Sequence, residues 1–388
     1  MELKKYKLGD CLELQRGYDL TSSQMQKGEV AVVGSNGIIG YHDTPRGNTP
    51  CITVGRSGSV GKVHYYERPT WAHNTALFVK DFKGNDPKYL YYYLKNLHLD
   101  NMFEKGSSVI PSLDRKVVHS LVVPFHKDRN DQRKIATILS TIDKKIELNR
   151  QINDNLEAMA KQLYDYWFVQ FDFPNEEGKP YKSSGGEMVY NERLKREIPK
   201  GWEILHLADC LSCKTERVDK SEIQKTDFYT PIEVIPRKQM SLNETVPIEE
   251  AVSGICRYKK GNILLSNRRV YFHKVCIAPF DGLTRDTVIV LEPIRKELLA
   301  YYYETVFSEK FIAYATKHSY GSEQPVLSWS AAQKFEILKP TNQLDYKFST
   351  VVDNIIETVL NNHKEIGQLN KLRDELLPLL MNGQLTIA

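Results

Sequence analysis

The chain has 388 residues, 41% of them hydrophobic and 26% charged, and its 53 basic and 49 acidic side chains leave a formal net charge of +4. This is the composition of an ordinary globular protein with room for two domains, and the charge permits nucleic-acid binding only through a local basic face. No run of eighteen apolar residues occurs and no apolar segment follows MELKKYKLGD, so we expect a cytoplasmic protein with no membrane span and no secretion.

Residues 1–130 are predicted to form a first α/β domain. An apolar strand, Ile52–Val54, leads into a glycine loop, Gly55–Val63. A Walker A phosphate loop would need Gly where Arg56 stands and Ser or Thr where Val63 stands, so we reject a nucleotide site. Two interpretations stay open, a structural hairpin and a loop that contacts DNA. The residues that would contact DNA are Arg56, Ser57, Ser59 and Lys62.

The segment after Asp86–Pro87 has helical character and carries the run Tyr91–Tyr93. Its tyrosines and leucines would fall on neighbouring faces of a helix, so we interpret it as a packed core helix rather than a platform for base stacking. A polar loop with Lys105, Ser107 and Ser108 follows and precedes an apolar strand. Such a loop suits contacts with phosphates or base edges, and a solvated turn is the alternative.

Residues 131–172 are predicted to form a spacer helix. Asp131–Phe168 contains neither Gly nor Pro, and its apolar residues recur every seven positions. Such a helix would span roughly 57 Å, which is too long for one compact domain, although a long core helix of a larger bundle is an alternative. The first seam position holds Ile135, Ile142, Asn149, Leu156 and Leu163, and the second holds Ile138, Ile152 and Met159.

Residues 173–200 are rich in Gly, Pro, Ser and charge and are predicted to be a linker. Residues 201–345 then repeat the first domain, because the pattern Leu-x-Asp-Cys-Leu around Cys11 recurs around Cys210. We therefore predict a tandem duplication with the order domain, helix, domain, helix and with pseudo-twofold symmetry. Further matches are Thr75–Val79 with Thr287–Leu291, Tyr91–Tyr93 with Tyr301–Tyr303, and Val122–Pro124 with Ile337–Pro340.

The second domain carries Asn267, Arg268 and Arg269 where the first has its glycine loop. Arg can bond guanine and Asn can bond adenine, each through two hydrogen bonds, so this exchange would change the bases read and leave the scaffold alone. The loop with Lys317 and Tyr320 matches the polar loop of the first domain, and we predict that it also contacts DNA.

Residues 346–388 are predicted to form a second spacer helix that pairs antiparallel with the first. Its apolar residues follow one another at steps of three, four or seven. They are Val352, Ile355, Val359, Ile366, Leu369, Leu372, Leu376 and Leu380.

Catalytic motifs are absent from the sequence. It has no Asn-Pro-Pro-aromatic tetrapeptide, no glycine motif for S-adenosylmethionine or ATP, and neither HExxH nor GxSxG. Only Cys210 and Cys213 form a CxxC, and without a second pair this is a weak zinc signal, so we predict buried thiols and no metal. We interpret the chain as a two-headed binding protein. The alternatives are a standalone DNA-modifying enzyme and a coiled-coil assembly scaffold whose heads bind carbohydrate or protein.

Four segments carry a family resemblance that covers nearly the whole chain. They are Val54–Val63, Gln132–Ala136, Leu163–Phe168, and Ile198–Glu203 with Leu207–Asp209. In this order they resemble the specificity subunit of a type I restriction-modification system. The second unit departs from the pattern, because its loop lacks the glycines and Tyr346–Lys347 stands where the first has Gln132–Arg133.

The resemblance implies an α+β fold in which two duplicated α/β target-recognition domains are separated by two long antiparallel coiled-coil helices. It implies a bipartite target in double-stranded DNA, one half-site per domain. It also implies two methyltransferase subunits that methylate adenine N6 and restriction subunits driven by ATP. S-adenosylmethionine, ATP and Mg²⁺ would then be bound by those partners, and this chain would need no cofactor.

Overall fold

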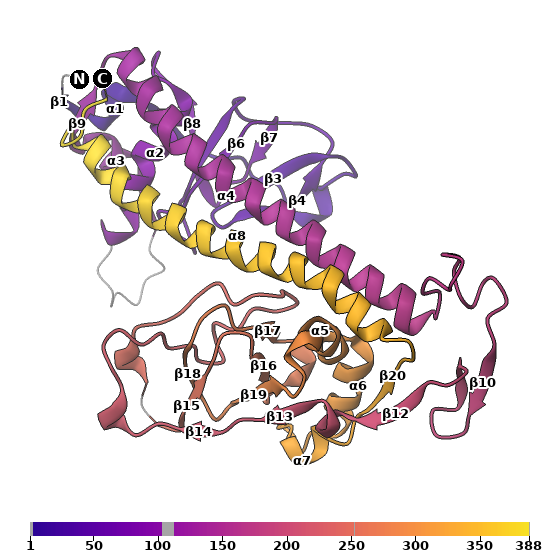
Figure 1. Ribbon diagram of the computed structural model, residues 1–388. Coiled ribbons are helices and arrows are strands. Elements are labelled where there is room, and N and C mark those ends of the chain that lie inside the picture. The colour runs from indigo at the N-terminus through magenta and orange to yellow at the C-terminus, as the bar shows by residue number, and fades with distance from the viewer. Residues whose placement is uncertain (1–2, 103–111, 252, 388) are drawn as a thin grey trace. The chain divides into compact units, whose positions relative to one another are not determined.

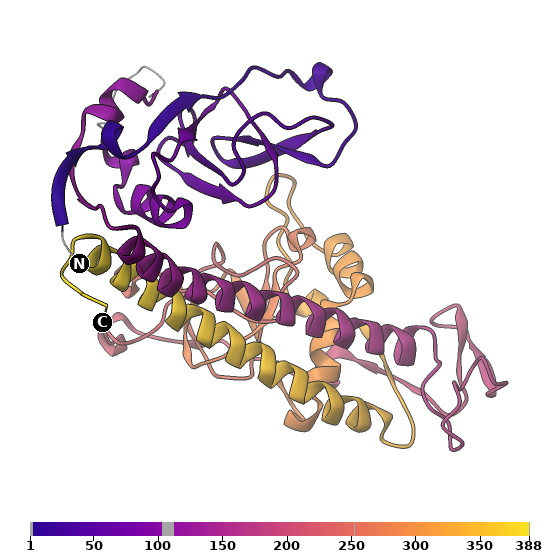
Figure 2. The same ribbon diagram turned by 90° about the horizontal axis from the view of Figure 1, so that it is seen from above.

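The computed structural model describes residues 3–102, 112–251 and 253–387 (Figure 1). The chain divides into two compact units: unit 1 comprises Met1–Ile146 with Gln368–Ala388, and unit 2 comprises Glu147–Gly367. Two long helices, α4 (Arg129–Tyr164) and α8 (Leu344–Met381), contribute to both units. Within each unit their portions lie side by side (Figures 1 and 2), and the rest of the unit is one α/β head.

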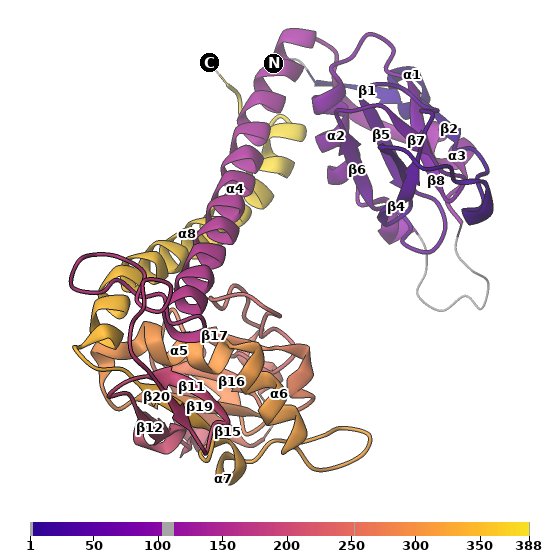
Figure 3. The same ribbon diagram turned by 90° about the vertical axis from the view of Figure 1, so that its right-hand side faces the viewer.

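The head of unit 1 is built around a four-stranded antiparallel sheet with the strand order β2-β8-β5-β6 (Figure 3). A three-stranded sheet, β4-β3-β7, and an antiparallel pair, β1-β9, complete it. Helix α2 packs against β6, and α1 packs against α3. The bounds are β1 Leu3–Lys7, α1 Leu8–Cys11, β2 Glu13–Arg16, β3 Val30–Gly34, β4 Gly37–His42, β5 Cys51–Gly55, β6 Val63–Tyr66, β7 Thr70–Ala72, β8 Ala76–Asp81, α2 Pro87–Asn96, α3 Arg115–Ser120 and β9 Val122–His126.

The head of unit 2 repeats this arrangement. Its four-stranded sheet has the order β13-β19-β16-β17, β12 pairs with β20 as β1 pairs with β9, and a three-stranded sheet has the order β14-β15-β18. The matching orders confirm the predicted duplication and the α+β class. The bounds are β12 Glu203–His206, β13 Leu211–Cys213, β14 Glu216–Arg217, β15 Ile255–Tyr258, β16 Ile263–Ser266, β17 Val275–Ile277, β18 Gly282–Arg285, β19 Val288–Pro293, α5 Leu299–Phe307, α6 Glu309–Lys317, α7 Trp329–Ala332 and β20 Glu336–Lys339.

The tyrosine runs lie in core helices, as predicted. Asp86 caps α2, since its side chain accepts a hydrogen bond from Tyr89 N at 3.0 Å, and Tyr89 and Tyr93 are buried. The hydroxyl of Tyr93 donates to the carbonyl of Pro124 in β9, and the hydroxyl of Tyr301 in α5 donates to the carbonyl of Leu338 in β20. A buried phenol needs such a partner, and both heads provide it from the same strand of the fold.

The predicted linker, residues 173–200, is folded and packed onto unit 2. It contains an antiparallel hairpin, β10 (Met188–Asn191) with β11 (Arg196–Pro199). The ring of Phe173 stacks on Tyr181 at 4.6 Å and on Trp202 at 5.4 Å between centroids. The Gly and Pro residues that indicated a flexible linker therefore form turns, and stacked aromatic rings hold the segment to the head.

The second row of the predicted seam on α4 is wrong at two of its three residues, since only Ile138 is partly buried against the core of unit 1. Ile152 and Met159 are 37% and 57% exposed. The buried row lies one residue further along and consists of Leu139, Ile146, Asn153 and Ala160. The first row stands, with Ile135, Ile142 and Asn149 buried and Leu156 and Leu163 partly buried. The shift follows from packing, because α4 covers a head as well as its partner helix and so buries a wider stripe than a coiled-coil seam.

Along α8 the buried row includes Val359 and Ile366 with Ile355 partly buried, as predicted, but Leu372 is 44% exposed. Arg373 occupies the next position of the row instead, since it follows Ile366 by seven residues. Its guanidinium binds the Asp143 carboxylate of α4 at 3.0 Å, and the other oxygen of Asp143 accepts from the hydroxyl of Tyr92 at 2.6 Å. One carboxylate therefore joins both helices to the head of unit 1.

In unit 2 the helix seam contains a polar layer. Asn149 Nδ2 donates to Glu365 Oε2 at 2.7 Å, and Asn362 Nδ2 donates to Asn153 Oδ1 at 2.8 Å. Both α4 asparagines are buried. A buried asparagine in a helix seam lowers stability but selects one register, since a shift would leave its amide without a partner.

Gln132, in the first turn of α4, is fully buried and joins the helix to the head of unit 1. Its Nε2 donates to Asn85 Oδ1 at 2.8 Å and to the His126 carbonyl at 2.7 Å, and its Oε1 accepts from Asp86 N at 2.8 Å. At the other end, Phe168 packs its ring against Tyr301 and Phe348 in unit 2. Two of the four segments behind the family resemblance, Gln132–Ala136 and Leu163–Phe168, therefore attach the long helix to a head.

Two carboxyl groups, the buried Glu304 and the half-buried Glu157, make the stability of unit 2 depend on pH. Burial raises the pKa of Glu304 in α5 to about 8, and the nearby carboxylate of Asp165 adds to this. Burial also raises the pKa of Glu157 in α4 to about 7, although the Met240 amide donates to it. The folded chain therefore keeps protons that the unfolded chain releases above pH 4.5, and the free energy of unfolding falls as the pH rises towards 8.

Glu304→Gln, which keeps the size of the side chain and removes its charge, is expected to stabilise unit 2 by roughly 4 kcal/mol at pH 8 and by less than about 1 kcal/mol at pH 5. Thermal unfolding of the full chain at both pH values measures this. Glu249→Gln in the same head is the matched control, because Glu249 is exposed. Equal stabilisation by Glu304→Gln at both pH values would contradict the prediction.

Candidate nucleic-acid interface

The glycine loop of unit 1 is a tight hairpin between antiparallel β5 and β6, which confirms the structural part of its interpretation. Gly55 N donates to the Lys62 carbonyl at 2.7 Å, and Gly61 N donates to the Gly55 carbonyl at 2.9 Å. A Cβ at Gly55 would lie 1.9 Å from the carbonyl oxygen of Ser59, so no larger residue fits. Arg56, Ser57 and Ser59 are half-buried on this loop, and Lys62 is exposed.

Backbone hydrogen bonds attach this loop to the scaffold. The amides of Arg56 and Ser57 donate to the Thr75 carbonyl at 2.9 and 3.2 Å, and Leu113 N donates to the Arg56 carbonyl at 2.9 Å. Ser57 also forms an antiparallel bridge with Ser112. The predicted contacts Lys105, Ser107 and Ser108 lie outside the described residues. The described residue that follows them, Ser112, adjoins the glycine loop.

Unit 2 makes the same three contacts with different residues. Asn267 N donates to the Thr287 carbonyl at 3.0 Å, Leu327 N donates to the Asn267 carbonyl at 2.7 Å, and Arg268 forms an antiparallel bridge with Val326. Val326 also exchanges two backbone hydrogen bonds with Tyr320, at 3.0 and 2.8 Å. The structure therefore brings the predicted loops at 267–269 and 317–320 together, with Lys317 and Tyr320 exposed.

The side chains of the loop in unit 2 differ in what they can contact. Asn267 Nδ2 donates to the Asp286 carbonyl at 2.9 Å and Asn267 Oδ1 is buried, so the amide does not present both a donor and an acceptor to adenine. Arg269 has a left-handed backbone (φ 47°) and donates through its main chain to the Pro325 carbonyl and through its guanidinium to the Glu323 carbonyl. Arg268 is exposed and makes no side-chain hydrogen bond to another described residue, so its guanidinium is available for contact with a ligand.

Sequence reasoning missed one loop of unit 1, the turn Ser35–Gly37 between β3 and β4. Ser35 N donates to Thr75 Oγ1 at 3.3 Å, and Lys62 Nζ donates to Asn36 Oδ1 at 2.7 Å. The turn therefore lies beside the glycine loop and shares its anchor, Thr75. The dipeptide Asn36-Gly37 between two apolar runs was the available signal, because Asn-Gly is a preferred hairpin turn.

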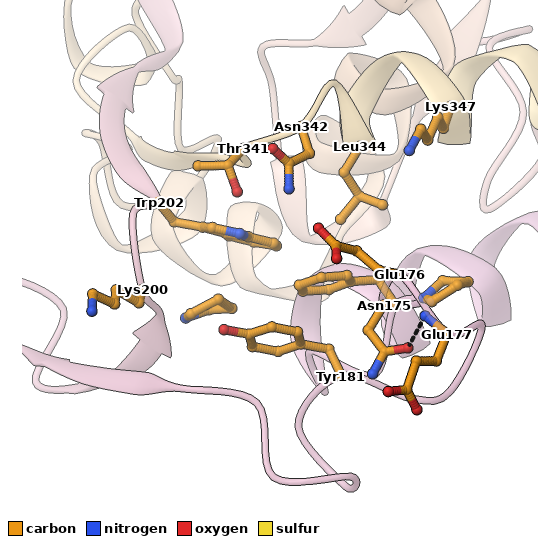
Figure 4. Close-up of a pocket in the computed structure, with 13 residues that line it drawn as sticks. Asn175, Glu176, Glu177, Tyr181, Lys200, Trp202, Thr341, Asn342, Leu344 and Lys347 are labelled. Atoms are coloured by element: carbon orange, nitrogen blue, oxygen red, sulfur yellow. Dashed lines mark hydrogen bonds between the residues drawn. The ribbon is translucent and has the colours of Figure 1, made fainter.

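A cavity of about 460 Å³ lies in unit 2 beside the folded linker (Figure 4). Phe173, Tyr181, Trp202 and Lys347 are among the residues that line it, and its rings stack on one another. Among the described residues no group of three His, Cys, Asp or Glu side chains could hold a metal ion, and no helix is long and apolar enough to cross a membrane. The cysteines are free thiols, and all except the half-buried Cys213 are buried.

Comparison with known proteins places this arrangement in a family. A family model described as the type I restriction modification DNA specificity domain matches residues 1–158 and 199–371, and the chain belongs to this family. It is 28% identical over 324 residues to the type I restriction enzyme MjaIX specificity subunit of Methanocaldococcus jannaschii, covering 77% of this chain and 69% of that one. It is 25% identical over 337 residues to the HindI specificity subunit of Haemophilus influenzae, covering 73% of each.

The fold is also that of a solved relative. The crystal structure of the type I restriction-modification S subunit from M. genitalium matches 98% of this chain and 96% of its own, with a TM-score of 0.63 and 18% sequence identity. The predicted family and fold class are therefore confirmed.

Gly55→Ala is expected to distort the glycine loop, because the added methyl group would meet the Ser59 carbonyl. Overpacking of this kind costs about 1 to 3 kcal/mol, and discrimination at the first half-site should be lost while the second is unaffected. Gly47→Ala in the same head is the control, since a Cβ there meets only ordinary contacts at 3.6 to 3.7 Å. Binding of each variant to duplexes altered in one half-site at a time measures discrimination at the first and at the second half-site. Unchanged discrimination by Gly55→Ala would contradict a role for this loop.

Proposed function

We propose that this protein is the DNA-recognition subunit of a type I restriction-modification complex and that each head reads one half of a bipartite target. The observation that carries the proposal is the set of three backbone contacts that both heads make. They hold Arg56 and Ser57 in unit 1 and Asn267 and Arg268 in unit 2 at equivalent positions. A constant backbone with exchanged side chains is the arrangement expected of two readers of different sequences.

Family membership favours DNA recognition over an assembly scaffold with carbohydrate- or protein-binding heads. The relatives are named as specificity subunits, which supports a recognition role rather than a catalytic one. We propose that adenine methylation and DNA cleavage take place on methyltransferase and restriction subunits, which would bind S-adenosylmethionine, ATP and Mg²⁺. The two helices would hold the heads and carry those partners.

An exposed apolar stripe on α4 suits such a partner. Leu148, Ile152 and Met159 of α4 are exposed, and so is Tyr166 in the π-helical turn Asp165–Val169 that continues the helix. They follow one another at steps of four and seven, so they share one face within unit 2. Exposed apolar side chains aligned over several turns mark an interaction surface. We propose that this stripe receives a methyltransferase subunit, and its place on the helix explains why sequence periodicity assigned Ile152 and Met159 to the buried seam.

Exchange of residues 1–126 for the corresponding region of a relative should change one half-site only, because every loop of the first head lies within that range and the second head stays intact. Base-resolved sequencing of methylated DNA from cells that make the hybrid with its methyltransferase measures the target. The reciprocal exchange of residues 201–340 serves as the control and should change the other half. A change in both halves by either hybrid would overturn the proposal of one reader per head.

Met159→Asp is expected to weaken association with the methyltransferase subunit about tenfold or more, since it places a charge in the centre of the apolar stripe. Ala158→Asp introduces the same charge at the adjacent exposed position on a different face and should have little effect. Co-purification and titration of the two subunits measure this, and DNA binding by the isolated chain checks folding. Equal effects of the two substitutions would contradict a docking role for the stripe.

A further inference from the structure

A polar side chain of the turn Ser35–Gly37 and two apolar side chains that follow it in β4 are exposed in unit 1, where the turn lies beside the glycine loop. Asn36 is exposed and bound to Lys62. Directly after the turn, Ile38 and Ile39 are 51% and 49% exposed at the start of β4. Two consecutive exposed isoleucines beside a polar turn indicate a surface that is covered in a complex.

Two contacts fix the position of this turn against the glycine loop. The hydroxyl of Thr75 accepts a hydrogen bond from Ser35 N, and its carbonyl accepts hydrogen bonds from the Arg56 and Ser57 amides. A Cβ at Gly55 would also lie 3.0 Å from the Ser35 carbonyl, so the two loops are in contact. The counterpart of Thr75 in unit 2, Thr287, has a buried hydroxyl with no partner among the described residues. This linkage of two loops is therefore a feature of the first head.

The contact between Asn36 and Lys62 determines what the pair can bind. An ammonium group only donates hydrogen bonds, so the Asn36 atom that faces Lys62 Nζ at 2.7 Å must be the amide oxygen. The donors that remain are the two N–H bonds of Asn36 Nδ2 and the two remaining N–H bonds of Lys62 Nζ. Asn36 Oδ1 keeps one lone pair, but the Lys62 ammonium lies 2.7 Å from this oxygen, so the pair presents mainly donors and positive charge.

An asparagine reads adenine by donating to N7 and accepting from the N6 amine. Here that mode is disfavoured, because the hydrogens of the N6 amine would approach Oδ1 beside the positive ammonium of Lys62. Guanine presents two acceptors in the major groove, N7 and O6, which match the donors and the positive charge of this pair. We propose that Asn36 and Lys62 together recognise a guanine in the first half-site. This inference rests on the proposed function, since it names a base read by the first head.

The test uses the full chain and duplexes that carry its methylated target. Each guanine of the first half-site is replaced in turn by 7-deazaguanine, which lacks the N7 acceptor. At one position the replacement should weaken binding by the wild-type chain about tenfold. The variants Asn36→Ala and Lys62→Met should bind the normal and the substituted duplex almost equally at that position, because they already lack the contact with N7. Lys80→Met is the matched control, since Lys80 is an exposed lysine of the same head whose Nζ lies 3.0 Å from a Glu13 oxygen.

A second variant, Asn36→Asp, keeps the contact with Lys62 and so retains the local structure, but it replaces the amide donors with acceptors. It should lose the preference for guanine at that position while the second half-site stays unchanged. Circular dichroism and binding to the second half-site verify that each variant is folded.

Three results would overturn the inference. One is a first half-site without guanine, and another is wild-type discrimination by the Asn36 and Lys62 variants. The third is a uniform loss of affinity on all sequences with a smaller dependence on salt, which would mean that the pair contacts phosphate oxygens instead. Failure of the wild-type chain to discriminate among sequences at all would instead overturn the proposed function.

Discussion

Two loops can differ in their side chains and keep the same backbone conformation only if the same backbone partners satisfy their hydrogen bonds. In both heads one partner is the carbonyl of the threonine directly before a central strand, Thr75 or Thr287. The other is the backbone N–H of Leu113 or Leu327, which donates to the loop. The loop at Arg56 uses glycines and the loop at Asn267 does not, yet the three contacts are the same. The rest of the fold keeps those anchors in place.

The periodicity of the sequence predicted both long helices, and the internal matches predicted the duplicated heads, because both depend on patterns that packing imposes over many residues. Periodicity could not separate the buried row of α4 from the exposed stripe at Ile152 and Met159, since both repeat every seven residues. Nor could it foresee that Arg373 would replace a leucine in the seam. That choice depends on Asp143 and Tyr92, which lie far away in the sequence and come together only in the folded unit.

The positions of the candidate loops could be predicted from the sequence, but the side chains that remain available for binding could not. Matching loops in the repeat located the segments around Arg56 and Asn267 correctly beside their anchors. Which side chains remain available was decided by tertiary contacts, such as the bond from Asn267 to the Asp286 carbonyl, that no local pattern records. The turn at Asn36 had a local signal, but its relation to Lys62 comes from two hairpins packed against one threonine.

The division of α8 between the units has a consequence for the order in which the protein acquires its structure. Unit 2 is one continuous stretch, Glu147–Gly367, whereas unit 1 needs Gln368–Ala388 as well as its own first 146 residues. Leu377, Leu380 and Met381 are buried in the core of unit 1. During synthesis, unit 1 therefore cannot complete its core until residues 368–388 have been made. All residues of unit 2 have been made before that point. Until α8 emerges, the apolar surface that receives these three side chains stays open to solvent or to a chaperone.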